Sequence, residues 1–75
     1  MPPPSASDLA RAQQLAANER HLVDAQRRLI TSLAAQGHDI AAAKNLLQEM
    51  LATLASLEER RDRMEATIAA NQNSG

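Results

Sequence analysis

The chain has 75 residues, of which 44% are hydrophobic and 23% charged, and its formal net charge is −1. This length allows one small domain, and the near-neutral charge gives no long-range attraction to nucleic acid or to an anionic membrane. Cysteine is absent, which excludes disulfides and thiolate metal sites. Because aromatic residues are also absent and Ala, Leu, Gln, Glu and Arg dominate, the composition predicts an all-α fold.

The first seven residues, Met-Pro-Pro-Pro-Ser-Ala-Ser, are predicted to form a disordered tail (1–7), because proline favours extended backbone over helix. They lack the basic and apolar regions of a signal peptide, and no apolar run approaches the ~20 residues that cross a bilayer. We therefore expect a cytoplasmic protein without membrane contact. Ser7 is the expected N-cap of a helix over 8–36, with Asp8 at the positive end of the helix dipole.

Two rows of apolar residues run along this first predicted helix, each with a spacing of seven residues. The rows are Leu9, Ala16, Val23 and Ile30, and beside them Leu15, Leu22 and Leu29. Ala12 and Leu33 widen the apolar face, whereas Glu19 and Gln26 bring polar groups onto its flank. Such a wide face is typical of a helix that contacts two neighbours, as in a four-helix bundle.

The segment 37–39, Gly-His-Asp, predicts a tight turn. Gly37 can take the left-handed conformation beyond a helix end, and Asp39 can cap the next helix. A connection this short makes the second helix, over 40–70, fold back antiparallel along the first. Residues 71–75 are predicted to be a second disordered tail.

The second predicted helix carries the apolar pattern of a coiled coil. Ile40, Leu47, Leu54 and Ile68 share one position of a seven-residue repeat, and Ala43, Met50, Leu57 and Met64 share another. Arg61 interrupts the first row, and whether it forms a buried polar layer with Glu19 and Gln26 is left open by the sequence. If the hairpin closes at the Gly37 turn, facing residues have numbers that sum to about 75. This register predicts two ion pairs, Arg11 with Glu65 and Arg27 with Glu49.

A lone hairpin would leave much of both apolar faces in water, so we expect it to dimerise into a four-helix bundle. The partner is a second copy, with another helical protein as the alternative. The predicted core and oligomer interface is formed by Leu9, Leu15, Leu22, Val23, Leu29, Ile30, Leu33, Ile40, Leu47, Met50, Leu54, Leu57, Met64 and Ile68.

The sequence offers no catalytic, cofactor or metal site. His21 and His38 lie about 25 Å apart along the hairpin, and the Glu-x-x-His spacing of bundle metal sites does not occur. The predicted function is therefore a non-enzymatic interaction or scaffold module. The alternative is an RNA- or DNA-binding hairpin dimer, but interleaved acidic residues and the lack of aromatics disfavour it. That alternative would use Arg27, Arg28, Arg60, Arg61 and Arg63.

Three segments resemble a group of short uncharacterised bacterial proteins. The segments are Glu19-Arg20-His21-Leu22, the run Gln26 to Ile30, and Gly37-His38-Asp39 followed by Ala43 and Leu46-Leu47. In that group a helix leads through a central Gly-His-Asp turn into a second helix. The resemblance covers about residues 19–50, and it implies a helical hairpin of bacterial source with no assigned activity.

Overall fold

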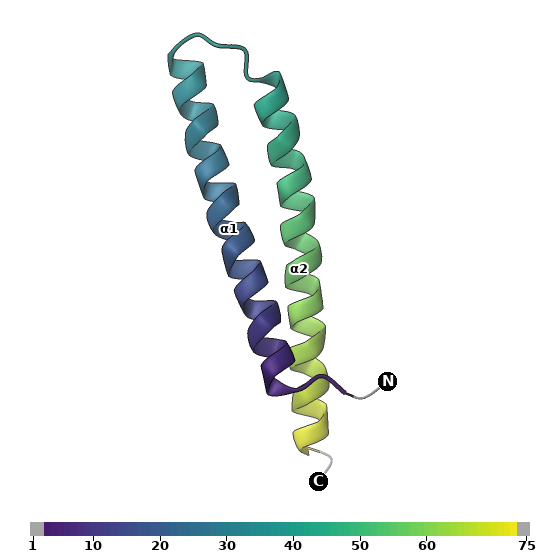
Figure 1. The fold of residues 1–75 in the computed structure, drawn as a ribbon. Coiled ribbons are helices and arrows are strands. Elements are labelled where there is room, and N and C mark those ends of the chain that lie inside the picture. The colour runs from purple at the N-terminus through teal and green to yellow at the C-terminus, as the bar shows by residue number, and fades with distance from the viewer. Residues whose placement is uncertain (1–2, 74–75) are drawn as a thin grey trace.

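A computed structural model describes residues 3–73 as two helices joined by a short turn, α1 (Ala6–Ala35) and α2 (Ala41–Asn73). The helices lie side by side and antiparallel, with the start of α1 and the end of α2 at the same end of the hairpin (Figure 1). The molecule is a rod of 60 × 17 × 15 Å. The predicted all-α helical hairpin is confirmed.

The N-terminus of α1 is fixed by a capping box. The backbone N–H of Asp8 donates to the Ser5 hydroxyl (3.1 Å), and the backbone N–H of Ser5 donates to Oδ2 of Asp8 (3.0 Å). This reciprocal pair satisfies two N–H groups at the helix start. The predicted N-cap, Ser7, is wrong, because α1 already begins at Ala6. Met1 and Pro2 of the predicted tail lie outside the described residues.

The turn has the hydrogen bonds of a Schellman motif. The His38 N–H donates to the Leu33 carbonyl (3.0 Å) and the Gly37 N–H to the Ala34 carbonyl (3.1 Å). Gly37 has φ of 78°, the left-handed conformation expected from the sequence. The carboxylate of Asp39 accepts from the Ala41 N–H (2.9 Å) and so satisfies the first free donor of α2.

The bounds of α2 differ from the prediction at both ends. It starts at Ala41 rather than 40 and runs to Asn73, so the predicted disordered tail is wrong for residues 71–73. Neither proline nor glycine occurs between Gly37 and Gly75, and therefore no strong stop signal ends the helix at residue 70. Ser74 and Gly75 lie outside the described residues.

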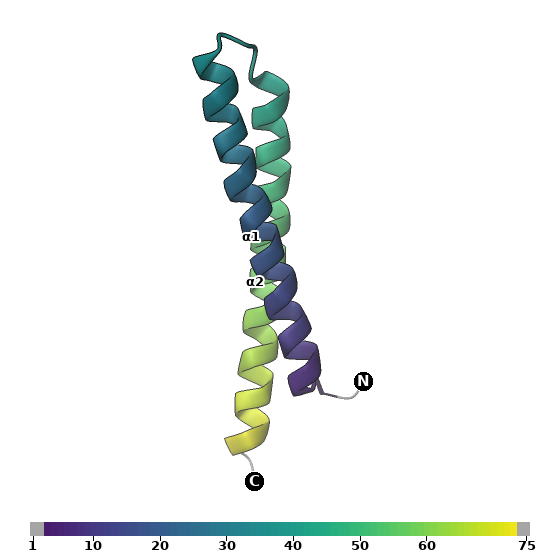
Figure 2. The same ribbon diagram turned by 60° about the vertical axis from the view of Figure 1, so that its left-hand side comes forward.

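The core of a single hairpin is small. Only Ala12, Ala16 and Val23 are buried among the described residues, and all three belong to α1. Seen after a 60° turn, α1 crosses α2 along the middle of the rod (Figure 2). Small side chains at 12 and 16 let the two helix backbones approach each other.

Candidate oligomerisation surface

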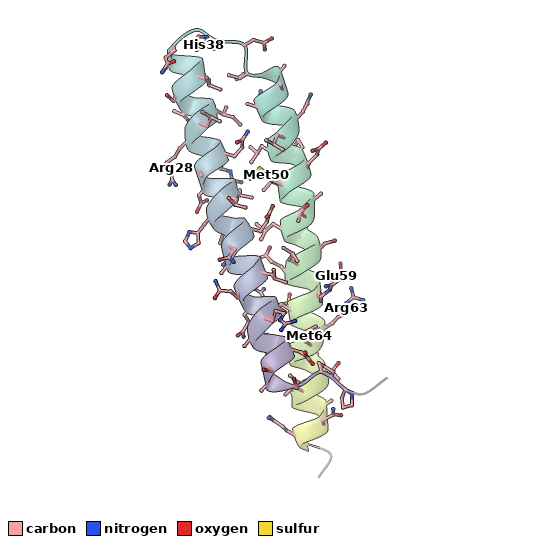
Figure 3. All side chains as sticks on the ribbon, in the orientation of Figure 1. Arg28, His38, Met50, Glu59, Arg63 and Met64 are labelled. Atoms are coloured by element: carbon pink, nitrogen blue, oxygen red, sulfur yellow. The ribbon has the colours of Figure 1, made fainter. Side chains whose placement is uncertain are left out.

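The apolar repeat of α2 faces α1. With Leu47 and Leu54 at position a of the heptad, the a and d residues from Ile40 to Ile68 are all half-buried, whereas none of residues 41–72 is fully buried. Met50 and Met64, both at d, point from α2 toward α1 (Figure 3). We call these a and d residues of both helices the seam. On the α2 side the seam consists of Ile40, just before the helix, and of Ala43, Leu47, Met50, Leu54, Leu57, Arg61, Met64 and Ile68.

On α1 the seam is partly polar. Its a positions are Leu9, Ala16, Val23 and Ile30, and its d positions are Ala12, Glu19, Gln26 and Leu33; all are buried or half-buried. The Gln26 side chain crosses to α2, where its Nε2 donates to the Ala43 carbonyl (2.9 Å). Within residues 3–73 no hydrogen bond joins Gln26, Glu19 and Arg61 to one another. The polar groups of the seam are therefore separate and do not form one layer.

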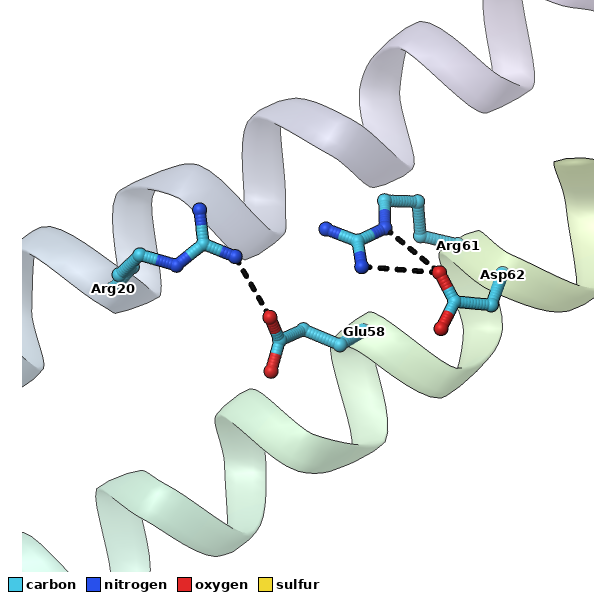
Figure 4. A network of polar contacts seen from close by, with 4 residues as sticks. All are labelled: Arg20, Glu58, Arg61 and Asp62. Atoms are coloured by element: carbon cyan, nitrogen blue, oxygen red, sulfur yellow. Dashed lines mark hydrogen bonds and ion pairs between the residues drawn. The ribbon is translucent and has the colours of Figure 1, made fainter.

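One ion pair connects the two helices directly. Nη2 of Arg20 lies 2.7 Å from Oε2 of Glu58, and both residues occupy position e, on one edge of the seam (Figure 4). The expected pairs, Arg11 with Glu65 and Arg27 with Glu49, are not formed among the described residues. That pairing prediction is wrong.

The observed contacts give the register of the hairpin. The residue numbers of Arg20 and Glu58 sum to 78, and those of Gln26 and Ala43 sum to 69. The two sums bracket the expected value of 75, and we take residues whose numbers sum to about 73, close to their mean, to lie at the same level along the rod. We give the level of an α2 residue as the number of the α1 residue beside it.

The opposite edge of the seam, at position g, is apolar and open. Leu15, Leu22 and Leu29, which we call the leucine stripe, are 43%, 55% and 47% exposed. Leu46, the g residue of α2 at the level of about residue 27, is 47% exposed. In an antiparallel helix pair both g edges lie on one side, so the stripe and Leu46 form one leucine face. Of the two apolar rows of α1, the hairpin covers the row at position a and leaves the row at position g exposed to solvent.

An open depression lies on the leucine face toward the chain ends. Its apolar lining, which we call its floor, consists of Ala12, Leu15, Leu57 and Met64. Charged side chains of Asp8, Arg11 and Arg60 complete the lining. The depression is centred at the level of about residue 12, whereas Leu29 and Leu46 lie at the other end of the same face.

Arg61, the residue that interrupts the seam, keeps its charge within its own helix. Its Nε and Nη2 donate to Oδ1 of Asp62 at 3.1 and 3.0 Å, and its side chain is 24% exposed. The hydrogen bond to Asp62 raises the pKa of Arg61 above its ordinary value, with nearby Glu58 and Glu65 acting in the same direction. Ala12, at the same level on α1, leaves room for the long stem of this side chain.

The arginines considered for nucleic-acid binding do not form one surface. Arg61 pairs with Asp62, and Arg63 lies 3.4 Å from Glu59. Arg28 points away from α2, and Arg63 points away from α1 (Figure 3). Arg28 and Arg60 differ by about 15 residues in level, which is roughly 22 Å. The five arginines are therefore divided between distant levels, and two of them are paired with carboxylates.

The histidines also lie apart. His21 is exposed at position f of α1, and His38 lies in the turn (Figure 3). Within residues 3–73 no group of three His, Asp or Glu side chains could hold a metal ion. Neither helix in this part of the chain is both long and apolar enough to cross a membrane. No protein-family model, curated protein or solved structure matches the chain.

Sequence reasoning missed three features of this surface. Ala12 and Ala16 are more buried than any leucine, and Leu46 is an exposed apolar residue that the predicted interface omitted. The heptad positions contained the signal, since Ala12 falls at d, Ala16 at a and Leu46 at g. Of the predicted interface residues, the leucine stripe is exposed, and all the others are buried or half-buried within the single hairpin.

Proposed function

We propose that the chain is a non-enzymatic helical interaction module that acts in the cytoplasm as a homodimer, with two hairpins packed into a four-helix bundle. The leucine face is the observation that carries this proposal. Four leucines that are each 43–55% exposed lie along one side of a rod only two helices thick. Contiguous apolar surface of this kind marks a protein contact.

The area of the hairpin supports the same proposal. Its accessible surface is 5511 Å², whereas a compact monomer of 8.1 kDa exposes about 4,500 Å². The excess of about 1,000 Å² is close to the ~800 Å² that each partner buries in a standard protein interface. A dimer formed through one face would therefore give each chain an ordinary surface for its mass.

The two long sides of the rod differ in character, which favours one face for this contact. The e side carries the Arg20–Glu58 ion pair together with Arg27, Lys44 and Glu65. The g side carries the leucine face. Burial of the g side, whose charged residues Asp8, Arg11 and Arg60 gather at the depression, desolvates fewer charges than burial of the e side.

Neighbouring residues allow a matched test of this function. Leu22→Glu places a charge in the middle of the leucine face, whereas His21→Glu places the same group on the outer side of α1. By light scattering, the unmodified chain and His21→Glu should have about twice the mass of 8.1 kDa, and Leu22→Glu should have the monomer mass. A folded monomer at every concentration of the unmodified chain would refute the homodimer and favour a different helical partner.

A further inference from the structure

Most of the apolar side chains of the leucine face belong to α1. Three of its four leucines belong to α1, while the g positions of α2 at the levels of Leu22 and Leu15 are Thr53 and Arg60. The way in which two faces meet therefore decides what the leucine stripe contacts. Two closed arrangements keep every neighbouring helix antiparallel.

In the first arrangement the two-fold axis runs along the rod, and α1 packs against α2 of the second copy. The leucine stripe then faces Thr53, Arg60 and a single leucine, Leu46. In the second arrangement the axis lies between the faces and perpendicular to the helices, so α1 packs antiparallel against α1. The stripe then faces the stripe of the second copy.

We propose, building on the homodimer above, that the hairpins adopt the second arrangement, with the two leucine stripes packed against each other. The stripe is centred at Leu22, close to the middle of α1 (Ala6–Ala35). A perpendicular axis at this level places Leu15 beside Leu29 of the second copy. It also overlaps the two rods along nearly their full length.

The depression fits the same axis. Its centre lies at the level of about residue 12, and the exposed pair Leu29 and Leu46 lies at about 28. The midpoint of these levels is about 20, within two residues of Leu22. The same rotation therefore brings Leu29 and Leu46 of one copy over the apolar floor of the depression in the other. Two equivalent contacts of this kind close the dimer.

Spin-label distances can distinguish the two arrangements, because the chain has no cysteine of its own. Ala52→Cys and Ala66→Cys change exposed alanines at position f of α2, at levels of about 21 and 7. With the perpendicular axis, the two Ala52 labels differ by only a few ångströms along the rod. The two Ala66 labels are then offset by about 40 Å along it, at ~1.5 Å per residue.

The expected result of double electron–electron resonance is a clearly longer distance for Ala66→Cys than for Ala52→Cys. Equal distances for the two variants would overturn the perpendicular axis and leave the homodimer standing. The absence of any distance between copies, with a monomer mass in light scattering, would refute the homodimer itself. The two failures are thus distinguishable.

Cross-linking tests the contact at the depression. A mixture of Leu46→Cys and Arg60→Cys chains should form a disulfide-linked dimer on mild oxidation, and it should do so faster than either variant alone. With the axis along the rod, positions 46 and 60 of different copies are separated by about 20 Å along the rod. The mixture should then form the disulfide no faster than either variant alone. Equal rates of disulfide formation for the mixture and the single variants would contradict the proposed contact of Leu46 with the depression of the second copy.

Discussion

Arg20 of α1 and Glu58 of α2 form an ion pair of 2.7 Å at the same edge of the seam, and it links the two helices along that edge. The side chains of Arg20 and Glu58 are 50% and 35% exposed, so water screens the attraction. The pair therefore contributes more to the register of the hairpin than to its stability. Arg27, Lys44 and Glu65 share this edge with the half-buried Leu51, whereas the other edge carries the exposed leucines.

A double-mutant cycle on Arg20→Ala and Glu58→Ala should give a coupling free energy of about 0.2–1 kcal/mol that shrinks as salt is added. Urea unfolding of the four chains measures it. The same cycle on Arg27 and Glu49, which are not paired, should give no coupling beyond experimental error. A larger coupling for Arg27 and Glu49 would show that the helices are shifted relative to the register described above.

Two nearby serines should differ in their effect on stability. Ser5→Ala removes the hydroxyl that accepts from the Asp8 N–H and should cost about 1 kcal/mol of unfolding free energy. Ser7→Ala changes an exposed residue inside the first turn and should cost less than ~0.5 kcal/mol. Denaturant melts of both variants measure the difference. Equal losses would contradict Ser5 as the N-cap.

The same cap predicts a dependence on pH. The backbone N–H of Ser5, followed by its hydroxyl, lowers the pKa of Asp8 in the folded chain. The associated stability is fully present above the unfolded pKa of about 3.9 and is lost as pH falls through the lower folded value. The melting temperature should thus decrease below about pH 4. Asp8→Asn should show a smaller decrease over that range, and an identical decrease would assign the effect to other carboxylates.

Gly37 should be sensitive to substitution for backbone reasons alone. A Cβ atom at this position would meet nothing within 4 Å, but φ of 78° is unfavourable for other residues. Gly37→Ala should cost about 1–2 kcal/mol and Gly37→Val more, whereas Gly37→Asn should be the mildest change. Thermal melts give the order. If the valine variant were as stable as the original, the left-handed turn would be wrong.

Replacement of Arg61 should stabilise the molecule. Arg61→Leu restores an aliphatic residue to position a of the seam and should raise the melting temperature, with the mass in light scattering unchanged. Arg63→Leu is the control, because that side chain is 75% exposed at the outer surface and should bring no such gain. A mixture of oligomers for Arg61→Leu alone would instead mean that the guanidinium selects the assembly.

The seam could be predicted from the sequence because a spacing of 3.5 residues selects one face of a helix. The same spacing could not say which of the two apolar rows of α1 meets α2. Val23 at a is buried and Leu22 at g is exposed, although both belong to one wide apolar face. The a and d positions of α1, which include Ala16 and Ala12, pack against α2, because small residues permit close approach of the backbones.

The errors at the helix ends also have a physical origin. Ser5 and Ser7 can both cap a helix, but only Ser5 is followed three residues later by a carboxylate, Asp8, that returns the hydrogen bond.

The two expected ion pairs follow from the register alone, which ignores the side of the helix on which a residue lies. Arg11 lines the depression on the g side, whereas Glu65 is at position e, and Arg27 at e is likewise opposed by Glu49 at c. The members of each expected pair therefore lie on opposite sides of the seam.

The distribution of the small core has a consequence for how the hairpin opens. Every buried side chain lies between Ala12 and Val23, and the described residues on the turn side of Val23 include none. In that half, a single hydrogen bond joins the two helices among the described side chains, from Nε2 of Gln26 to the Ala43 carbonyl. The part of α1 before Ala12 has no buried side chain either, so we expect local unfolding from both ends of the rod, and amide hydrogens near Ala16 should exchange last.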